Sequence, residues 1–167
     1  MFRFKCGSCD KWHEGAPSLA CQVPEPLLSV PPQERLARVQ LTADVASLDW
    51  TRFFVRACME VPIHGTNECF IWGLWAEVSR EDCQDYCDTS EKGIVGGPYD
   101  GTLANALPFY PDCFGIPVSI EPRPGDQRPL LLTPEGDSSL ARHLKDGMPE
   151  AEARAYFERV LHPGGLH

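Results

Sequence analysis

Two apolar stretches in the first half of the chain predict the central strands of a β-sheet. Apolar residues alternate with less apolar ones from Phe53 to Val61, a pattern typical of a strand with one buried face. After turn-forming residues 64–67, the run 69–76 is apolar on both faces, as in a central strand. Together with segment 41–48 and a turn over 49–51, these stretches predict three consecutive antiparallel strands in a meander.

Helix signals occur on either side of these strands. A short helix is predicted over 33–39, because Pro32 suits a first helical turn and the acidic Glu34 precedes the basic Arg35 and Arg38. Ser79 followed by Asp82 resembles a capping box and predicts a helix of about three turns. The buried face of that helix is expected to carry Cys83, Tyr86 and Cys87.

The second half of the chain predicts a hairpin and then helices. Segments 114–121 and 128–133 predict two strands joined by a tight turn, and 103–107 predicts a helical turn. Asp137 is expected to cap a helix over 138–145, and Pro149 to open a last helix. We therefore expect an α+β fold in which an antiparallel sheet of about five strands packs against helices. No repeat or charged linker divides the chain, so we expect a single domain over residues 1–167, with an N-terminal segment 1–24 and a body over 31–162.

Composition restricts the partners and the compartment. Lysine and arginine number 15 against 24 aspartates and glutamates, so the net charge of −9 disfavours nucleic acid and anionic membrane surfaces. A protein partner with a basic surface is the expectation that fits this charge. No apolar run approaches the ~20 residues of a membrane span, and the first residues lack the apolar core of a signal peptide. We expect a cytoplasmic protein whose 8 cysteines are reduced, buried or metal-bound.

The N-terminal segment carries the clearest chemical signal. Cys6 and Cys9 are separated by two residues, and His13 follows four residues later, so three ligands of a zinc ion lie close in sequence. Gly7 gives the intervening turn conformational freedom. The residues alone leave the fourth ligand open among Cys21, Cys58 and His64. A site closed by four protein ligands is structural and forms a zinc knuckle.

Three functional classes are compatible with this chemistry. The first is a non-enzymatic protein-binding module, of which an immunity protein that neutralises a toxin is one form. The second is a zinc enzyme that keeps one coordination position open for water. The third is a thiol oxidoreductase, although the helix that such a protein needs after the second cysteine is not predicted. Arg123 and Arg128 flank a turn, where they could hold an anion or act as exposed edge charges.

Several segments occur in the order typical of one protein family. They are Cys6-Gly7-Ser8-Cys9 with His13-Glu14-Gly15, then Phe53–Ile63, Phe70–Trp75 and Arg123–Leu130. With them the chain resembles the bacterial domain of unknown function 2199 family, whose pattern departs from this sequence over 83–101 and at Cys21. The resemblance implies a stand-alone bacterial cytoplasmic protein, and it transfers no catalytic residue. It also implies that Cys58 belongs to the common pattern, which favours Cys6, Cys9, His13 and Cys58 as zinc ligands.

Overall fold

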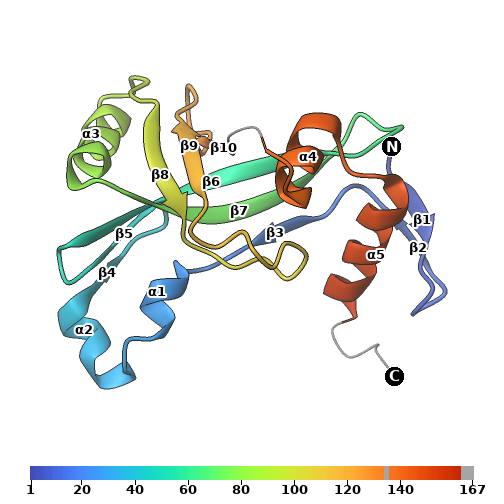
Figure 1. The fold of residues 1–167 in the computed structure, drawn as a ribbon, viewed down its shortest axis with the longest axis horizontal. Helices are drawn as coiled ribbons and strands as arrows, with labels where there is room; N and C mark the ends of the chain where they lie inside the picture. Colours follow the sequence, from blue (N-terminus) through green and yellow to red (C-terminus); the bar gives the residue numbers. More distant parts are fainter. Residues whose placement is uncertain (134–135, 163–167) are drawn as a thin grey trace. The chain divides into compact units, whose positions relative to one another are not determined.

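A computed structural model describes residues 1–133 and 136–162 of the chain. The chain forms two compact units made of interleaved segments. The first, here the terminal unit, comprises Met1–Leu19, Glu60–Ile71 and Glu135–His167, and the second, here the barrel unit, comprises Ala20–Met59 and Trp72–Pro134. Figure 1 shows the elements of both units in chain order.

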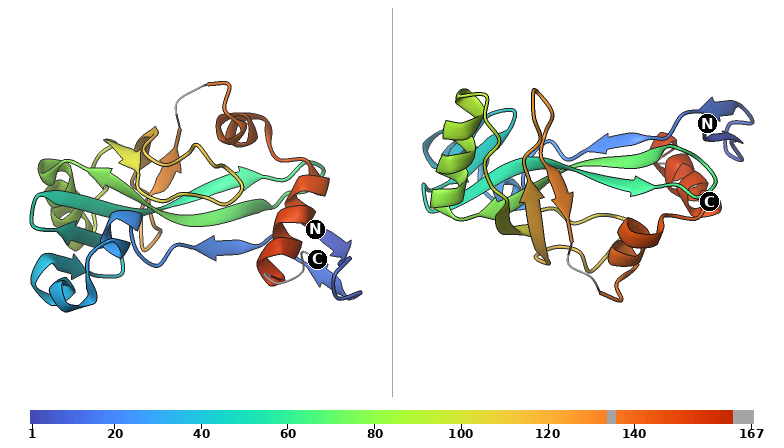
Figure 2. Two further views of the ribbon diagram at one scale, coloured as in Figure 1. Left: turned by 60° about the horizontal axis from the view of Figure 1, so that its bottom comes forward. Right: turned by 90° about the horizontal axis from the view of Figure 1, so that it is seen from above.

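The elements alternate between short strands and short helices, with two long strands in the middle of the chain. The strands are β1 (Arg3–Lys5), β2 (Trp12–Glu14), β3 (Ser18–Ala20), β4 (Val39–Leu41), β5 (Val45–Leu48), β6 (Arg52–Pro62), β7 (Cys69–Val78), β8 (Tyr99–Leu103), β9 (Pro117–Glu121) and β10 (Leu130–Leu132). The helices are α1 (Glu25–Leu28), a 3-10 turn (Pro32–Glu34), α2 (Arg35–Arg38), α3 (Arg80–Glu91), α4 (Ser139–Asp146) and α5 (Glu150–Leu161). β6 and β7 lie side by side in both views of Figure 2.

Five of the strands close into a barrel. Neighbours follow the order β7, β8, β9, β10 and β6, and a further pairing of β7 with β6 completes the ring. The pairs from β7 through β10 are antiparallel, whereas β10 runs parallel to β6, with Leu130 opposite Cys58. The α+β class is thus confirmed, but the expectation of a simple antiparallel sheet is wrong, because a parallel pair joins the last strand to the first long one.

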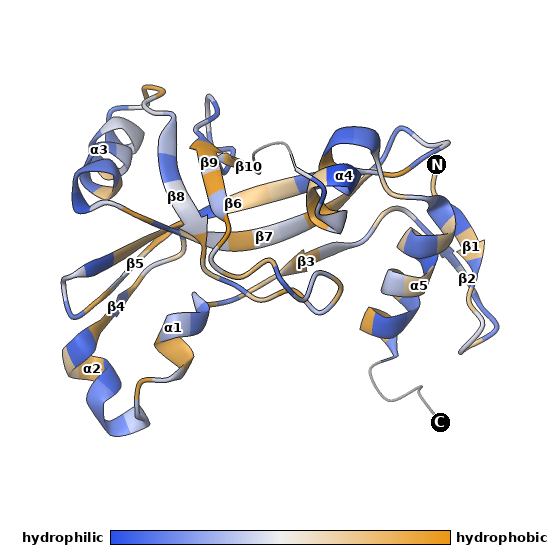
Figure 3. Cartoon of the chain, in the orientation of Figure 1, coloured by the Kyte–Doolittle hydropathy of each residue, from blue (hydrophilic) through white to orange (hydrophobic). Residues whose placement is uncertain are grey.

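β6 is more deeply buried than its alternating pattern predicts. Every residue from Phe53 to Ala57 is buried, so the strand has two covered faces and not one. On one side Phe54 belongs to a core cluster with Ala46, Leu48 and Trp75. On the other side Phe53 is stacked against the guanidinium of Arg80, at the start of α3. In Figure 3 the labelled part of β6 has an apolar colour, whereas α3 is mostly polar to neutral in colour.

The helices agree with the capping signals in part. The Ser79 side chain accepts a hydrogen bond from Asp82 N at 3.0 Å, so the predicted start of α3 is confirmed. The cap of α4 is Ser138, whose side chain accepts from Ala141 N at 3.1 Å, and not Asp137. The helical turn expected over 103–107 is absent among the described residues, because Ala104 N donates to Trp75 O at 2.8 Å and continues the strand ladder.

The terminal unit is held together by one carboxylate as well as by apolar contacts. Glu68 accepts from Phe2 N at 2.9 Å through Oε1 and from Ala16 N at 2.7 Å through Oε2. The two N–H groups flank the β1–β2 hairpin, so Glu68 anchors both ends of it. Met148 pairs with Ile63 in an isolated bridge, which fixes the chain between α4 and α5.

Candidate metal centre

The metal-competent residues lie on and beside the β1–β2 hairpin. Phe4 is opposite His13 in the antiparallel register, so Cys6 follows directly after the first strand and His13 lies within the second. The turn between them is closed by Cys6 N donating to Lys11 O at 2.8 Å and Asp10 N donating to Cys6 O at 3.0 Å. The left-handed residue of this turn is Asp10, with φ 58°, and not Gly7. Aspartate tolerates this conformation better than most side chains do.

Four side chains converge at this turn. The ligand atoms of Cys6, Cys9, His13 and His162 all lie within 4.8 Å of one another. Cys9 Sγ and His13 Nε2 are 3.3 Å apart. In a tetrahedral zinc site, metal–ligand lengths of about 2.3 Å to sulfur and 2.0–2.1 Å to nitrogen place sulfur and nitrogen about 3.6 Å from each other. The cluster therefore has the dimensions of a site that could hold a metal ion.

His162 supplies an independent sign of a missing partner. It is the residue directly after α5, and its backbone N–H donates to Glu158 O at 3.0 Å. The ring atom Nε2 is buried and has no hydrogen-bond partner within the described parts of the chain. A buried polar atom without a partner is costly, so it needs a hydrogen bond or a metal ion.

The environment of Cys6 favours the thiolate that a metal requires. Burial opposes ionisation of this thiol, but the backbone N–H groups of Cys9 and Ser8 donate to its sulfur and outweigh that effect. As a result, the pKa of Cys6 is lowered from the ordinary value of a cysteine. Because metal binding releases the thiol proton, a lowered pKa strengthens binding at neutral pH.

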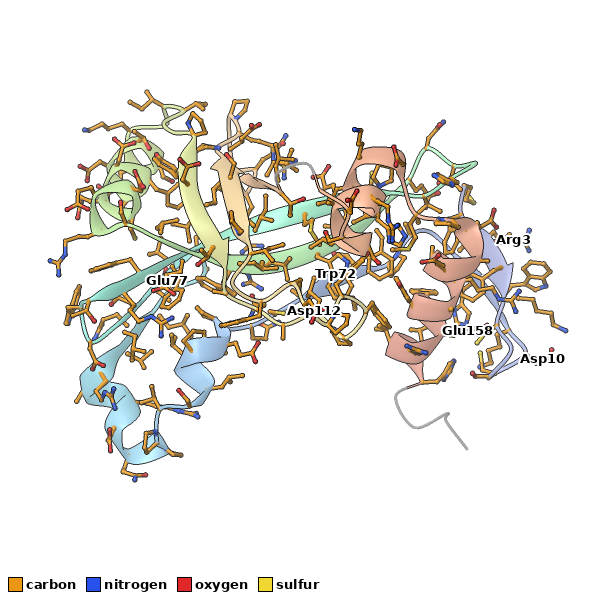
Figure 4. The ribbon with its side chains drawn as sticks, viewed as in Figure 1. Arg3, Asp10, Trp72, Glu77, Asp112 and Glu158 are labelled. Carbon is orange, nitrogen blue, oxygen red and sulfur yellow. The ribbon has the colours of Figure 1, made fainter. Side chains whose placement is uncertain are left out.

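Glu158 joins the last helix to the turn that carries the cysteines. Its Oε1 accepts from Gly7 N at 2.7 Å, a contact across 151 residues of sequence. This hydrogen bond lowers the pKa of the Glu158 carboxyl, and Arg154, whose Nε lies 3.3 Å from Oε1, contributes in the same direction. Glu158 is labelled in Figure 4, together with Asp10 of the turn. The helix is thus attached to the turn by a bond that does not depend on a metal.

Aromatic rings pack around the His13 imidazole. The His13 ring lies 5.5 Å from Phe4 and 5.6 Å from Phe157, and the His162 ring lies 6.5 Å from His13. Phe4 and Phe157 also meet edge to face at 5.3 Å. Packed rings lose few rotamers when a ligand binds, so the cluster is preorganised.

The structure brings together three of the four predicted ligands and adds one that the sequence did not indicate. Cys6, Cys9 and His13 converge, and His162 completes the group. Cys58 lies on β6 in the barrel unit, where its N–H donates to Pro129 O at 2.8 Å.

The other residues considered as ligands have different surroundings. Cys21 lies in the barrel unit, where burial raises the pKa of its thiol. His64 belongs to the terminal unit, and its Nε2 is already 2.6 Å from Asp146 O. Arg128 forms an exposed ion pair with Asp44, in which Nε lies 2.9 Å from Oδ1.

The fold and this cluster define an α+β protein with a closed five-stranded barrel and a Cys/His cluster that could hold a metal ion. The chain belongs to the family described as an uncharacterized protein conserved in bacteria, DUF2199, whose model matches residues 5–148. That range includes Cys6, Cys9 and His13 and ends before α5. No curated protein and no solved structure matches the chain. Among the described residues, no helix is long and apolar enough to cross a membrane.

Proposed function

We propose that the protein is a non-enzymatic, zinc-stabilised module that binds a protein partner, with zinc held by Cys6, Cys9, His13 and His162. The observation that supports the site most strongly is the convergence of four ligand atoms within 4.8 Å, one of them the buried and unpartnered Nε2 of His162. The proposal replaces Cys58 by His162 as the fourth ligand.

The donor set favours zinc in a structural role. Two thiolates and two imidazoles match the borderline-soft character of Zn²⁺ and its tetrahedral preference. Four protein ligands fill the coordination sphere and leave no position for a reactive water. A filled coordination sphere disfavours the zinc-enzyme alternative, which needs three protein ligands and one open position.

The ion would act as a clamp between distant parts of the chain. Three ligands belong to the hairpin, and the fourth follows α5, beside the contact that spans 151 residues. Closing a long loop restricts the unfolded chain more than closing a short one does. Zinc would therefore stabilise the folded terminal unit even though the hairpin is only two three-residue strands.

Cobalt substitution tests whether the site is closed. Co²⁺ bound in place of zinc reports its geometry through d–d absorption, and azide can bind only where a coordination position is open. For the wild-type protein we expect a tetrahedral spectrum that azide leaves unchanged. His162→Ala opens a position and should make the spectrum respond to azide. A wild-type spectrum that responds to azide would instead indicate an open, enzyme-like site.

The charge of the chain supports a basic partner. The net charge is −9, and α3 alone carries Glu81, Asp82, Asp85, Asp88 and Glu91. Complementary charge steers association, so the association rate of such a complex falls as salt rises. An immunity protein bound to a basic toxin would be one example of such a complex.

Partner capture tests this part of the proposal. Tagged protein would be used as bait in a bacterium that encodes a member of the family. We expect a stoichiometric complex whose association rate, measured by surface plasmon resonance, decreases steeply between low and physiological salt. A complex whose association is insensitive to salt, or the absence of any stoichiometric partner, would contradict it.

A further inference from the structure

The barrel unit contains a cavity that the metal centre does not use. It lies between α3 and the face of β5 and β6 that points away from the core cluster, and its volume is about 390 Å³. Ligand pockets typically measure about 300–1,000 Å³ and have mostly apolar walls with a few polar groups. This cavity has that character, with walls that include Val45, Ser47, Trp50, Phe53, Arg80, Cys83 and Cys87.

Ser47 is a polar group within this wall that lacks a partner. It is only 5% exposed, and its Oγ has no hydrogen-bond partner among residues 1–133 and 136–162. Ala46 and Leu48, its neighbours on β5, belong to the core cluster, so the alternation of the strand directs Ser47 to the opposite face. A buried hydroxyl without a partner is unfavourable, and a bound ligand with a polar atom would satisfy it.

Arg80 provides a cation without a counter-ion at the same cavity. Its guanidinium stacks on Phe53 at 4.9 Å and donates one hydrogen bond to Trp50 O. Within the described residues it forms no ion pair, whereas Arg38 and Arg52 of the same unit are paired with carboxylates. The remaining N–H groups of a stacked guanidinium are suited to bidentate recognition of a carboxylate.

Trp50 adds an aromatic surface at the edge of the cavity. It lies with Asp49 in the turn 49–51 between β5 and β6, and both residues have positive φ, 53° for Asp49 and 54° for Trp50. Glycine or asparagine usually fills such a turn, because a side chain in this conformation is strained. The Trp50 side chain is nevertheless 58% exposed, so its indole presents a flat apolar face to solvent.

The two cysteines of the wall act as apolar surface. Burial raises the pKa of the Cys83 thiol to about 12, and it raises that of Cys87 as well. Both thiols therefore remain protonated at neutral pH, and a protonated thiol is a poor nucleophile and a poor metal ligand. A ligand in this cavity would be held without a covalent bond.

We propose that the cavity under α3 binds a small aromatic carboxylate. Its ring would lie among Val45, Phe53 and Cys83, and its carboxylate would pair with Arg80. Ser47 would donate a hydrogen bond to a polar atom of the ligand. The proposal is independent of the metal centre, because every residue it uses belongs to the barrel unit.

Titration calorimetry on the full zinc-loaded chain tests this proposal with three probes: 2-naphthoate, indole-3-acetate and 4-phenylbutyrate. We expect at least one of them to bind with one-to-one stoichiometry. A charge-assisted hydrogen bond to an ionised group is worth enough that the matching neutral alcohol should bind at least about tenfold more weakly. Failure of all three probes to bind, or equal affinity for carboxylate and alcohol, would overturn the proposal.

Substitutions then locate the site. Arg80→Gln should weaken binding of the best probe at least about tenfold. Arg35→Gln is the matched control, since Arg35 also donates to a backbone oxygen, Val30 O at 3.0 Å, but does not line the cavity. Cys87→Leu keeps the charge and fills part of the space, so it should weaken binding while the melting temperature stays close to that of the wild type. Unchanged affinity in both Arg80→Gln and Cys87→Leu would place the ligand elsewhere and overturn the assignment.

Discussion

Phe4→Ala is expected to make the β1–β2 hairpin depend on metal for its position. The Phe4 ring is 4% exposed and lies 5.4 Å from Phe2 and 5.3 Å from Phe157, and the guanidinium of Arg154 is 5.6 Å from it. Replacing a buried phenylalanine by alanine costs roughly 3–5 kcal/mol. A two-stranded hairpin is marginal by itself, so this loss would fall mainly on its docking.

The expected size of the effect follows from that cost. About 4 kcal/mol corresponds to a factor of about one thousand in the equilibrium between docked and undocked hairpin. In the wild-type protein we expect the rings of Phe2 and Phe4 to keep the hairpin docked even when a chelator removes zinc. In Phe4→Ala the metal should supply most of the remaining free energy of docking.

Hydrogen exchange measured by mass spectrometry can follow this equilibrium in peptides that cover residues 1–16. Wild-type peptides should stay protected with and without chelator, whereas Phe4→Ala peptides should be protected only with zinc. Phe114→Ala is a suitable control, because Phe114 is 48% exposed and lies in the barrel unit. Equal protection of Phe4→Ala with and without chelator would show that zinc does not hold the hairpin, and loss of protection in the chelated wild type would show that the aromatic rings alone do not hold it.

Two further predictions concern titratable groups. The backbone N–H groups of Phe2 and Ala16 lower the pKa of the Glu68 carboxyl in the folded protein from its ordinary 4.5. The contribution of Glu68 to stability is therefore complete above pH 4.5 and is lost as the pH falls through the lowered pKa. Urea unfolding at several pH values should therefore show a shallower acid-side decline for Glu68→Gln than for the wild type, and an identical decline would contradict this. The pKa of Cys83 is raised to about 12, so iodoacetamide at pH 8 should modify Cys83 only after the protein is unfolded. Peptide mapping measures this modification. Modification of Cys83 in the folded protein at the rate of a free thiol would contradict the prediction.

Local signals in the sequence predicted much of the fold. The caps and prolines at Ser79, Pro32 and Pro149 mark helices that the structure contains, and the apolar run 69–76 lies within β7. The hairpin of β9 and β10 was also predicted. Each of these signals acts within one element or between neighbours in the chain, so the sequence carries it directly.

The features that the sequence did not predict depend on contacts between distant residues. Parallel pairing of β10 with β6 joins Leu130 to Cys58, and no local pattern specifies such a pair. The burial of both faces of β6 likewise depends on distant residues, since the core cluster with Trp75 covers Phe54 and Arg80 of α3 stacks on Phe53. Even the cap of α4 was misplaced by one residue, because Asp137 and Ser138 are both capable caps and only the observed geometry selects the serine.

The same distinction applies to the candidate metal centre. Cys6, Cys9 and His13 are close in sequence and were predicted together. His162 follows α5 at the far end of the chain, beyond any spacing that a zinc motif uses. Pro149 predicted the last helix, but nothing in that signal indicates that the residue after the helix reaches the hairpin.

The proposed zinc site consists of Cys6, Cys9, His13 and His162. Metal analysis by inductively coupled plasma mass spectrometry, on protein purified without a histidine tag, would identify the fourth ligand when wild type, His162→Ala and Cys58→Ser are compared. We expect one zinc per chain in the wild type and in Cys58→Ser, and a clear loss in His162→Ala after dialysis against a weak chelator. Full retention of zinc in His162→Ala together with its loss in Cys58→Ser would contradict it.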